Sequence, residues 1–343
     1  MTIDDHGLGY PYEDGSGPVT NTDMKDIPNA SMRRIFLVGC PRSGTTVVQA
    51  VLASLPGVMS FGETNYLLRL LGQFDRWLRG DPVTERKWRK RLRLAKRKTH
   101  RVMQHSIESA FERAEDVPRL RRHWSGRAYL REFCRALDLA SQAQGCHCWV
   151  EKTPDHLAYV DVLAREIPDA HFLHVVRNGE DVLASAIDGQ MRYRKHEVFE
   201  GGIPHWVERW NRAVGVHVQH AQDARHTVLP FECLFAAPDE VHRLLCNLAG
   251  IDEKLVPRRS GNRLHIADLD EEPWKRGSTE GIPRLPKRKF ERVFGPDTQH
   301  WIRAHLADYR QVINALALAQ PGLPWIASAM DVVTLPKEAA GGA

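Results

Sequence analysis

Residues 34–46, RIFLVGCPRSGTT, decide the fold of this 343-residue chain. The run Ile35–Val38 is entirely apolar, as in a strand that is buried on both faces of a parallel sheet. The loop after it is bracketed by Gly39 and Gly44, and apolar residues then recur at helical spacing over 45–55. Because backbone N–H groups at the start of a helix attract negative charge, the sequence predicts a strand–loop–helix unit that binds an anion.

The spacing of Gly39 and Gly44 is that of the phosphate-binding loop (P-loop) of nucleoside triphosphatases. Thr45, however, stands where such a loop carries the lysine that reaches the outer phosphates. Arg42 lies inside the loop instead, and its planar guanidinium can bind two oxygens of one anionic group. The loop is therefore expected to bind an anion without the lysine that a P-loop kinase uses.

This element resembles the 5′-phosphosulfate loop of sulfotransferases that use 3′-phosphoadenosine 5′-phosphosulfate (PAPS). The hexapeptide Pro-Arg-Ser-Gly-Thr-Thr is most similar to that of protein-tyrosine sulfotransferases and of bacterial carbohydrate or small-molecule sulfotransferases. The resemblance implies a PAPS-dependent sulfotransferase of EC class 2.8.2. It also implies which residues would hold the phosphosulfate: Arg42, Ser43, Gly44, Thr45 and Thr46.

Composition and charge are those of an ordinary globular protein. A formal charge of +5 and a hydrophobic fraction of 42% suit one large domain with an anionic ligand. The charge excess is too small to indicate nucleic-acid binding. The six cysteines form neither a Cys-x-x-Cys pair nor a zinc-ligand pattern, so we expect reduced structural thiols and no metal site.

The organisation predicted from the sequence is α/β, with a P-loop-like central parallel sheet flanked by helices. We expect a flexible leader at 1–30, a single domain at 31–325 and a tail at 326–343. Residues 67–145 have helical periodicity and read as a helical insertion or cap within the domain. The leader lacks the pattern of a secretion signal and no apolar run approaches a membrane span, so we expect a cytoplasmic protein. The sequence does not specify an oligomeric state.

Within the insertion, residues 86–98 are dense in arginine and lysine. Trp88, Leu92 and Ala95 would face inward on an amphipathic helix, which leaves the other side cationic. Such a charge run is usually a solvated helix face, and the alternative is a contact with an acidic acceptor or a polyanion.

Glu63 follows a short predicted strand at 58–61 and therefore lies at its carboxyl end. In protein-tyrosine sulfotransferases, a glutamate at the same distance after the loop arginine is the proposed general base, and this resemblance points to Glu63. The alternative without catalysis is a helix cap or a surface carboxylate. His156, one helical turn beyond Lys152, is the other candidate base, since some sulfotransferases use a histidine and its ordinary pKa suits the task.

Lys152 follows the predicted strand 148–150 and precedes a helix that Thr153 can cap. The sequence Glu-Lys-Thr-Pro resembles the lysine-bearing element of heparan sulfate sulfotransferases. That resemblance implies that Lys152 stabilises charge on the sulfuryl group or the bridging oxygen. A salt bridge with Glu151 or another acid is the alternative.

A second strand–loop–helix unit begins with the apolar strand at 171–176. Arg177 and Ser185 match, at the correct interval, the arginine and serine that bind the 3′-phosphate in sulfotransferases. Lys275 and Arg276 lie in a late irregular segment and resemble, more loosely, the basic loop that closes over the nucleotide; a plain surface loop is the alternative. The implied nucleotides are PAPS and its product, 3′-phosphoadenosine 5′-phosphate (PAP).

The pattern alone also predicts where these residues meet. Arg42, Glu63, Lys152 and Arg177 each follow a predicted strand, and ligands bind at the carboxyl edge of a parallel sheet. The resulting hypothesis is in-line sulfuryl transfer from PAPS to a hydroxyl of a carbohydrate or small-molecule acceptor, which can be anionic, with a carboxylate base and no metal requirement. A P-loop nucleotide kinase and a non-catalytic polyanion-binding module are the alternatives. The sequence does not identify the acceptor.

Overall fold

The computed structural model describes six stretches of the chain, residues 32–81, 97–111, 116–123, 125–193, 201–256 and 289–334. These residues belong to a single compact unit. The expected leader at 1–30, almost all of the basic stretch 86–98, and Lys275 and Arg276 lie outside the described residues.

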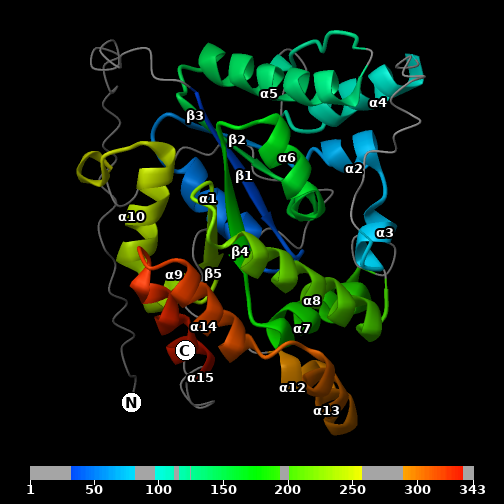
Figure 1. Cartoon of the computed structure of the whole chain (residues 1–343), viewed down its shortest axis with the longest axis vertical. Helices are drawn as coiled ribbons and strands as arrows, with labels where there is room; N and C mark the ends of the chain where they lie inside the picture. The colour runs from blue at the N-terminus through cyan, green and yellow to red at the C-terminus, as the bar shows by residue number, and fades with distance from the viewer. Residues whose placement is uncertain are drawn as a thin grey trace, which may run out of the picture. The chain divides into compact units, whose positions relative to one another are not determined.

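Five parallel strands form the central sheet, in the order β2-β3-β1-β4-β5 (Figure 1). The strands are β1 (Arg33–Gly39), β2 (Val58–Phe61), β3 (Cys148–Lys152), β4 (Ala170–Val176) and β5 (His226–Pro230). The all-parallel sheet flanked by helices confirms the predicted fold class.

The sheet centre is buried because its strands carry aromatic and branched side chains on both faces. Phe36 in β1 is fully buried, with its ring centroid 5.7 Å from Phe172 in β4 and 5.3 Å from Trp149 in β3. Leu37 pairs with Lys152 on one side and with Leu173 on the other. The carboxyl ends of β3, β1 and β4 therefore lie side by side.

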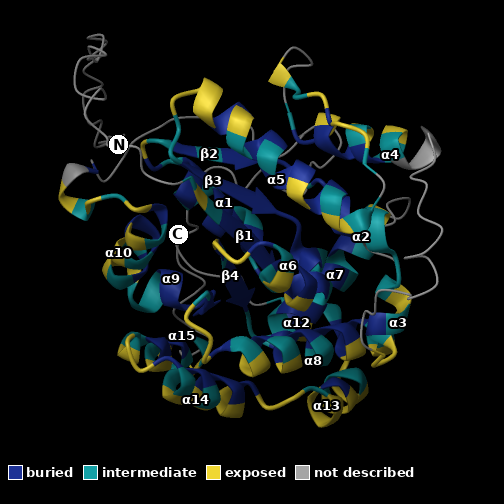
Figure 2. Cartoon of the chain, turned by 45° about the horizontal axis from the view of Figure 1, so that its top comes forward, coloured by how far each residue is buried: buried dark blue, intermediate teal, exposed yellow. Residues whose placement is uncertain are grey.

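Helices cover both faces of the sheet, and Figure 2 shows the central strands buried between them. On one face, α1 (Thr45–Ala53) and α10 (Pro238–Ala249) contact each other and β1. On the other face, α5 (Gly126–Ala143), α6 (Val160–Glu166) and α8 (Ile203–His220) contact β3 or β4. A 3-10 helix at Pro154–Tyr159 connects β3 to α6, and α7 (Gly179–Arg192) follows β4.

The described part of the insertion consists of helices and of a largely irregular segment at 116–123. Its helices are α2 (Tyr66–Leu71), α3 (Phe74–Leu78), α4 (Arg97–Glu108) and α5. Among the described residues, none of the helices has the length and apolar character that crossing a bilayer requires.

The C-terminal region differs from the single helix that the apolar periodicity of residues 297–320 predicts. It consists of α13 (Pro296–His305) and α14 (Tyr309–Ala319), and the side chain of Asp308 caps α14 by accepting the N–H of Arg310 at 2.9 Å. The short helix α12 (Phe290–Val293) precedes them.

Past α14, the chain continues into a 3-10 helix at Pro324–Ser328 and into α15 (Ala329–Thr334). Ile326 and Ala329 are fully buried, and both helices contact the short helix α9 (Cys233–Ala236). The packed core therefore extends beyond residue 325, where the tail was expected to begin.

Candidate functional site

The loop between β1 and α1 has an unusual backbone. Arg42 has φ +74° and Gly44 has φ +94°, both in the left-handed region. Such a conformation is uncommon for arginine and is found at functional sites more often than elsewhere. It turns the chain sharply, so that Thr45 and Thr46 open α1 directly beneath the loop.

The N-terminus of α1 is free to receive an anion from another molecule. In the described structure no side chain caps it, and its first turn contains no acidic residue. Ser43 is fully buried, and its Oγ has no hydrogen-bond partner among the described residues. Helix N-terminal N–H groups and a buried hydroxyl can both bind a phosphate or sulfate oxygen.

Glycine is required at position 44 by packing as well as by backbone conformation. A Cβ atom there would lie 2.2 Å from the ring of Phe231, which directly follows β5. The same ring lies under the Arg177 guanidinium, whose central carbon is 4.7 Å from the ring centroid. Phe231 thus fills the space between the first loop and Arg177.

Arg42 connects the first loop to α7. Its Nε donates a hydrogen bond to Ser185 Oγ at 3.1 Å. Burial, and secondly the nearby Arg177 guanidinium, lower the pKa of Arg42 to about 10, while the Glu63 carboxylate acts in the opposite direction. Two guanidinium groups close enough to repel each other make a site that an anion would stabilise.

Arg177 directly follows β4 and its side chain is only 14% exposed. One guanidinium nitrogen lies 3.5 Å from Asp181, whereas Nε is buried without a hydrogen-bond partner among the described residues. The adjoining N-terminus of α7 is already capped by Asn178, which accepts the N–H of Glu180 at 2.9 Å. An anion at this second turn would therefore be bound mainly by side chains and less by the N-terminus of the helix.

Glu63 and Lys152 form an ion pair at the ends of β2 and β3. The Lys152 side chain is fully buried, whereas the Glu63 side chain is 24% exposed. Lys152 lies within β3, so its strand neighbour Glu151 projects to the opposite side. The sequence left open a salt bridge between Lys152 and either Glu151 or another acid, and the acid paired with Lys152 is Glu63.

His156 is fully buried, and both of its ring nitrogens have partners inside the protein. Nδ1 lies 3.0 Å from Glu151 Oε2, and Nε2 accepts the backbone N–H of Leu67 at 3.2 Å. A side chain in this position has no contact with solvent, where an acceptor would arrive. The geometry does not support His156 as the alternative base.

The insertion borders the Glu63 side of this site. The N–H of Gly62 donates to the carbonyl of Ala110, just after α4, at 3.4 Å, and the rings of Phe61 and Phe111 are 5.2 Å apart. The hydroxyl of Tyr66 donates to the Tyr129 carbonyl in α5 at 2.9 Å. Two helices of the insertion therefore contact the segment that carries Glu63.

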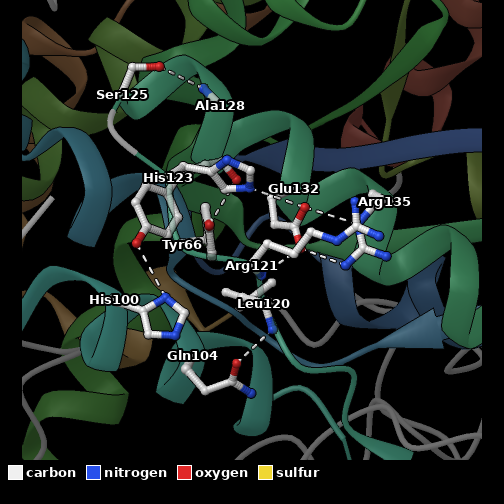
Figure 3. A network of polar contacts seen from close by, with 11 residues as sticks. Tyr66, His100, Gln104, Leu120, Arg121, His123, Ser125, Ala128, Glu132 and Arg135 are labelled. Atoms are coloured by element: carbon white, nitrogen blue, oxygen red, sulfur yellow. Dashed lines mark hydrogen bonds and ion pairs between the residues drawn. The ribbon is translucent and has the colours of Figure 1, made fainter. Parts of the chain in front are cut away.

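A polar network fixes residues 116–123 against α4 and α5 (Figure 3). Buried Glu132 accepts the N–H of Arg121 at 2.7 Å and pairs with Arg135 and His123. Burial would raise the pKa of Glu132, but these three partners lower it to about 2. Gln104 in α4 holds the same segment by accepting the N–H of Leu120 at 2.9 Å.

The structure brings together most of the residues singled out in the sequence. Arg42, Ser43, Gly44, Thr45, Thr46, Glu63, Lys152, Arg177 and Ser185 converge at one edge of the sheet. Sequence reasoning missed the contacts of Phe231 and the buried partners of Glu151. The sequence signal for the partners of Glu151 was the presence of two charged residues, Glu151 and Lys152, at the end of a strand. No group of three or more His, Cys, Asp or Glu side chains in the described stretches is arranged to hold a metal ion.

Known proteins similar to this chain point to one family. The chain matches the model of the sulfotransferase family over residues 34–254. Protein-tyrosine sulfotransferase 1 of Danio rerio is 25% identical over 233 residues, which are 67% of this chain and 57% of the relative. The protein-tyrosine sulfotransferase of Drosophila melanogaster is 24% identical over 216 residues, 62% of this chain and 37% of the relative. The match thus spans 57% of the length of the Danio rerio relative and 37% of that of the Drosophila melanogaster relative.

Among solved structures, the sulfotransferase domain from the Synechococcus PCC 7002 olefin synthase is 18% identical and has a TM-score of 0.42. That comparison covers 82% of this chain and 98% of the domain. The family match spans well over half of the chain and includes the loop after β1, the turn after β4, Glu63 and Lys152. The chain therefore belongs to the sulfotransferase family.

Proposed function

We propose that this chain transfers the sulfuryl group of PAPS to a hydroxyl of a carbohydrate or small-molecule acceptor. The observation that carries the proposal is the convergence of two turns far apart in sequence, joined by the bond from Arg42 to Ser185. A P-loop kinase does not need a second cationic turn, whereas a nucleotide with phosphates at both its 3′ and 5′ positions does.

The residues of the two turns fit the two ends of PAPS. The uncapped start of α1, together with Arg42 and Ser43, offers donors to the 5′-phosphosulfate. Arg177 and Ser185 offer a guanidinium and a hydroxyl to the 3′-phosphate. A buried guanidinium with an unsatisfied donor, such as the Arg177 Nε among the described residues, binds an anion strongly, because a charge-assisted hydrogen bond then satisfies that donor.

In this arrangement Glu63 accepts the proton of the acceptor hydroxyl. PAPS supplies the sulfuryl group and a phosphate as leaving group. Lys152 holds the Glu63 carboxylate in position and is a buried fixed cation beside the transferred group. Arg42 offsets the negative charge that builds on the leaving phosphate. Fixed donors and cations of this kind supply the largest share of stabilisation in loose, in-line transfer.

The acceptor would enter from the insertion side. A cleft of about 650 Å³ is lined there by His100, Gln104, Glu108, Phe111, Val117, Arg119 and Leu120. Its volume suits a small ligand. Arg119, Arg121 and Arg122 are exposed on the segment that the network of Figure 3 fixes, so an acceptor that carries negative charge fits best.

Calorimetry tests the nucleotide assignment. The chain should bind PAP and should bind ATP with Mg²⁺ much more weakly; the reverse preference would favour a nucleotide kinase. An acceptor screen with sulfate-labelled PAPS then tests transfer. It should include anionic and neutral carbohydrates, phenols, and tyrosine peptides, since the relatives are protein-tyrosine sulfotransferases. Binding of PAP without transfer to any acceptor would favour a non-catalytic module.

A further inference from the structure

The segment after Glu63 is attached to the rest of the protein in an unusual way. Residues 65–67 donate their three consecutive backbone N–H groups to side chains. The acceptors are Thr153 Oγ1 for Asn65 at 3.3 Å, Thr64 Oγ1 for Tyr66 at 3.2 Å, and His156 Nε2 for Leu67 at 3.2 Å. These are the orphan donors at the start of α2, whose cap residue Asn65 is left-handed and provides no side-chain cap.

One carboxylate organises these three acceptors. Glu151 Oε1 accepts the hydroxyls of Thr64 at 2.7 Å and Thr153 at 2.6 Å, and Oε2 accepts from His156 Nδ1 at 3.0 Å. All four side chains are at most 1% exposed. Burial would raise the pKa of Glu151, but the His156 imidazole and the two hydroxyls hold it below its ordinary value. A buried carboxylate with this many donors is stable as an anion.

The proton positions in this group follow from its geometry. The Leu67 N–H can only donate, so His156 Nε2 must carry a lone pair. The imidazole proton is therefore on Nδ1, where it is donated to Glu151. Each hydroxyl likewise gives its one proton to Glu151 and keeps lone pairs for the backbone. Every donor has an acceptor only as long as Glu151 remains an acceptor on both oxygens.

Three residues of this group are adjacent in sequence to Glu63 or Lys152, the two residues of the ion pair. Thr64 follows Glu63, and Glu151 and Thr153 stand on either side of Lys152. We propose that Glu151, Thr64, Thr153 and His156 form a clamp whose members are positioning residues that hold the Glu63 carboxylate against Lys152. The inference rests on the proposed role of Glu63. It assigns a function to His156 that differs from that of a base.

A pair of Thr64 variants tests the clamp without introducing a charge or a large cavity. Thr64→Val keeps the shape but removes the hydroxyl that joins Glu151 to the Tyr66 N–H, while Thr64→Ser keeps that hydroxyl. Thr227→Val is the matched control, since it also removes a buried threonine hydroxyl. Thr227 lies in β5, at the opposite edge of the sheet, and its hydroxyl is 2.9 Å from His171 Nε2.

Two measurements are needed, one of them independent of activity. Hydrogen–deuterium exchange of the peptide that contains residues 65–67 should be faster in Thr64→Val and unchanged in Thr64→Ser and in Thr227→Val. The kcat of sulfuryl transfer should fall about 10- to 100-fold in Thr64→Val only, because displacement of a catalytic group by about 1 Å costs that much. The Kd for PAP should stay at the wild-type value in all three.

Glu151→Gln is the second probe. Its amide would present N–H groups where the clamp needs an acceptor, which reverses the His156 tautomer and leaves the Leu67 N–H without a partner. It should accelerate exchange at 65–67 more than Thr64→Val does and lower kcat further. Thr64→Val with wild-type exchange, or with fast exchange and wild-type kcat, would overturn the clamp. If wild-type protein binds PAP but sulfates no acceptor, the proposed function fails. The clamp is rejected separately if hydrogen–deuterium exchange at 65–67 is unchanged in Thr64→Val and in Glu151→Gln.

Discussion

Arg42 Nε donates to Ser185 Oγ over 3.1 Å, although 143 positions separate the two residues in the sequence. The contact is possible because β1 and β4 are adjacent in the sheet, with Gly39 beside Val175. The loop after β1 and the helix after β4 therefore start from neighbouring points. A ligand bound here would contact both the loop after β1 and the helix after β4. Substitution of single residues in either element should therefore change its binding.

Arg177→Ala should weaken binding of PAP by about 1.5–3 kcal/mol, because a charge-assisted contact to the 3′-phosphate is lost. Affinity for adenosine 5′-phosphosulfate, which has no 3′-phosphate, should not change. Titration calorimetry with both nucleotides measures the difference. Arg243→Ala is the control, since this exposed arginine in α10 pairs with Glu240 and Glu253. Equal losses for the two nucleotides would reject a 3′-phosphate contact.

Glu63→Gln should lower kcat about 10²- to 10⁴-fold while leaving the Kd for PAP unchanged, because general-base catalysis contributes that much to such a reaction. The amide is isosteric and keeps an oxygen toward Lys152, so the fold should be preserved. Single-turnover transfer of labelled sulfate gives the rate. Glu208→Gln, an exposed position in α8, controls for loss of a carboxylate. Near-normal turnover in Glu63→Gln would remove Glu63 as the base.

The edge of the sheet where the site lies could be predicted because strand ends are readable from apolar runs. Arg177 directly follows one such run and Arg42 lies in the loop after another, and the carboxyl ends of parallel strands lie at the same edge. The partner of Lys152 could not be predicted, because β3 continues two residues past its apolar run. Glu151 and Lys152 resemble a loop in sequence, yet both are fully buried. Their burial depends in part on Glu63 and Thr64, distant partners that no local pattern reveals.

The break between α13 and α14 was missed for a similar reason. Helical periodicity continues across residues 306–308, and no proline or glycine interrupts it. Asp308 nevertheless starts a new helix by capping it. The hydroxyl of Tyr309 then reaches buried Glu232 at 2.6 Å, and that carboxylate also accepts the N–H of Asn178 beside the site. Packing against the site region thus overrides a pattern that alone predicts one long helix.

Gly44→Ala should destabilise the protein and weaken PAP binding, because the new Cβ would lie 2.2 Å from the Phe231 ring at a residue with φ +94°. Gly145→Ala is the matched control, since Gly145 has φ +71° and nothing within 4 Å of a Cβ. The control should show only the backbone cost, about 1 kcal/mol, measured by chemical denaturation. Gly44→Ala should lose more, and Phe231→Leu should recover part of the excess. Equal losses in the two alanine variants would show that Phe231 imposes no constraint.

A cluster of histidines makes stability depend on pH. Between β4, β5 and α8, buried His174 lies 3.0 Å from His217 and 2.9 Å from His226, nitrogen to nitrogen. Burial, and then nearby His220, lower the pKa of His217 to about 3 and that of His226 to about 4. Burial lowers the pKa of His174 well below its ordinary value as well. The folded protein therefore keeps these side chains neutral.

The unfolded chain protonates the same histidines near pH 6.5, so it binds more protons than the folded chain as the pH falls below that value. The contribution of these histidines to the free energy of unfolding should be constant above pH 7. It should then fall between pH 6.5 and about 4, by up to about 1.4 kcal/mol per pH unit for each histidine. Urea denaturation at pH 7.5, 6.0 and 5.0 measures the slope. His226→Gln should reduce it, whereas exposed His105→Gln should not. A free energy that does not change from pH 7.5 to 5.0 would contradict a neutral cluster, because ordinary carboxylates titrate below this range.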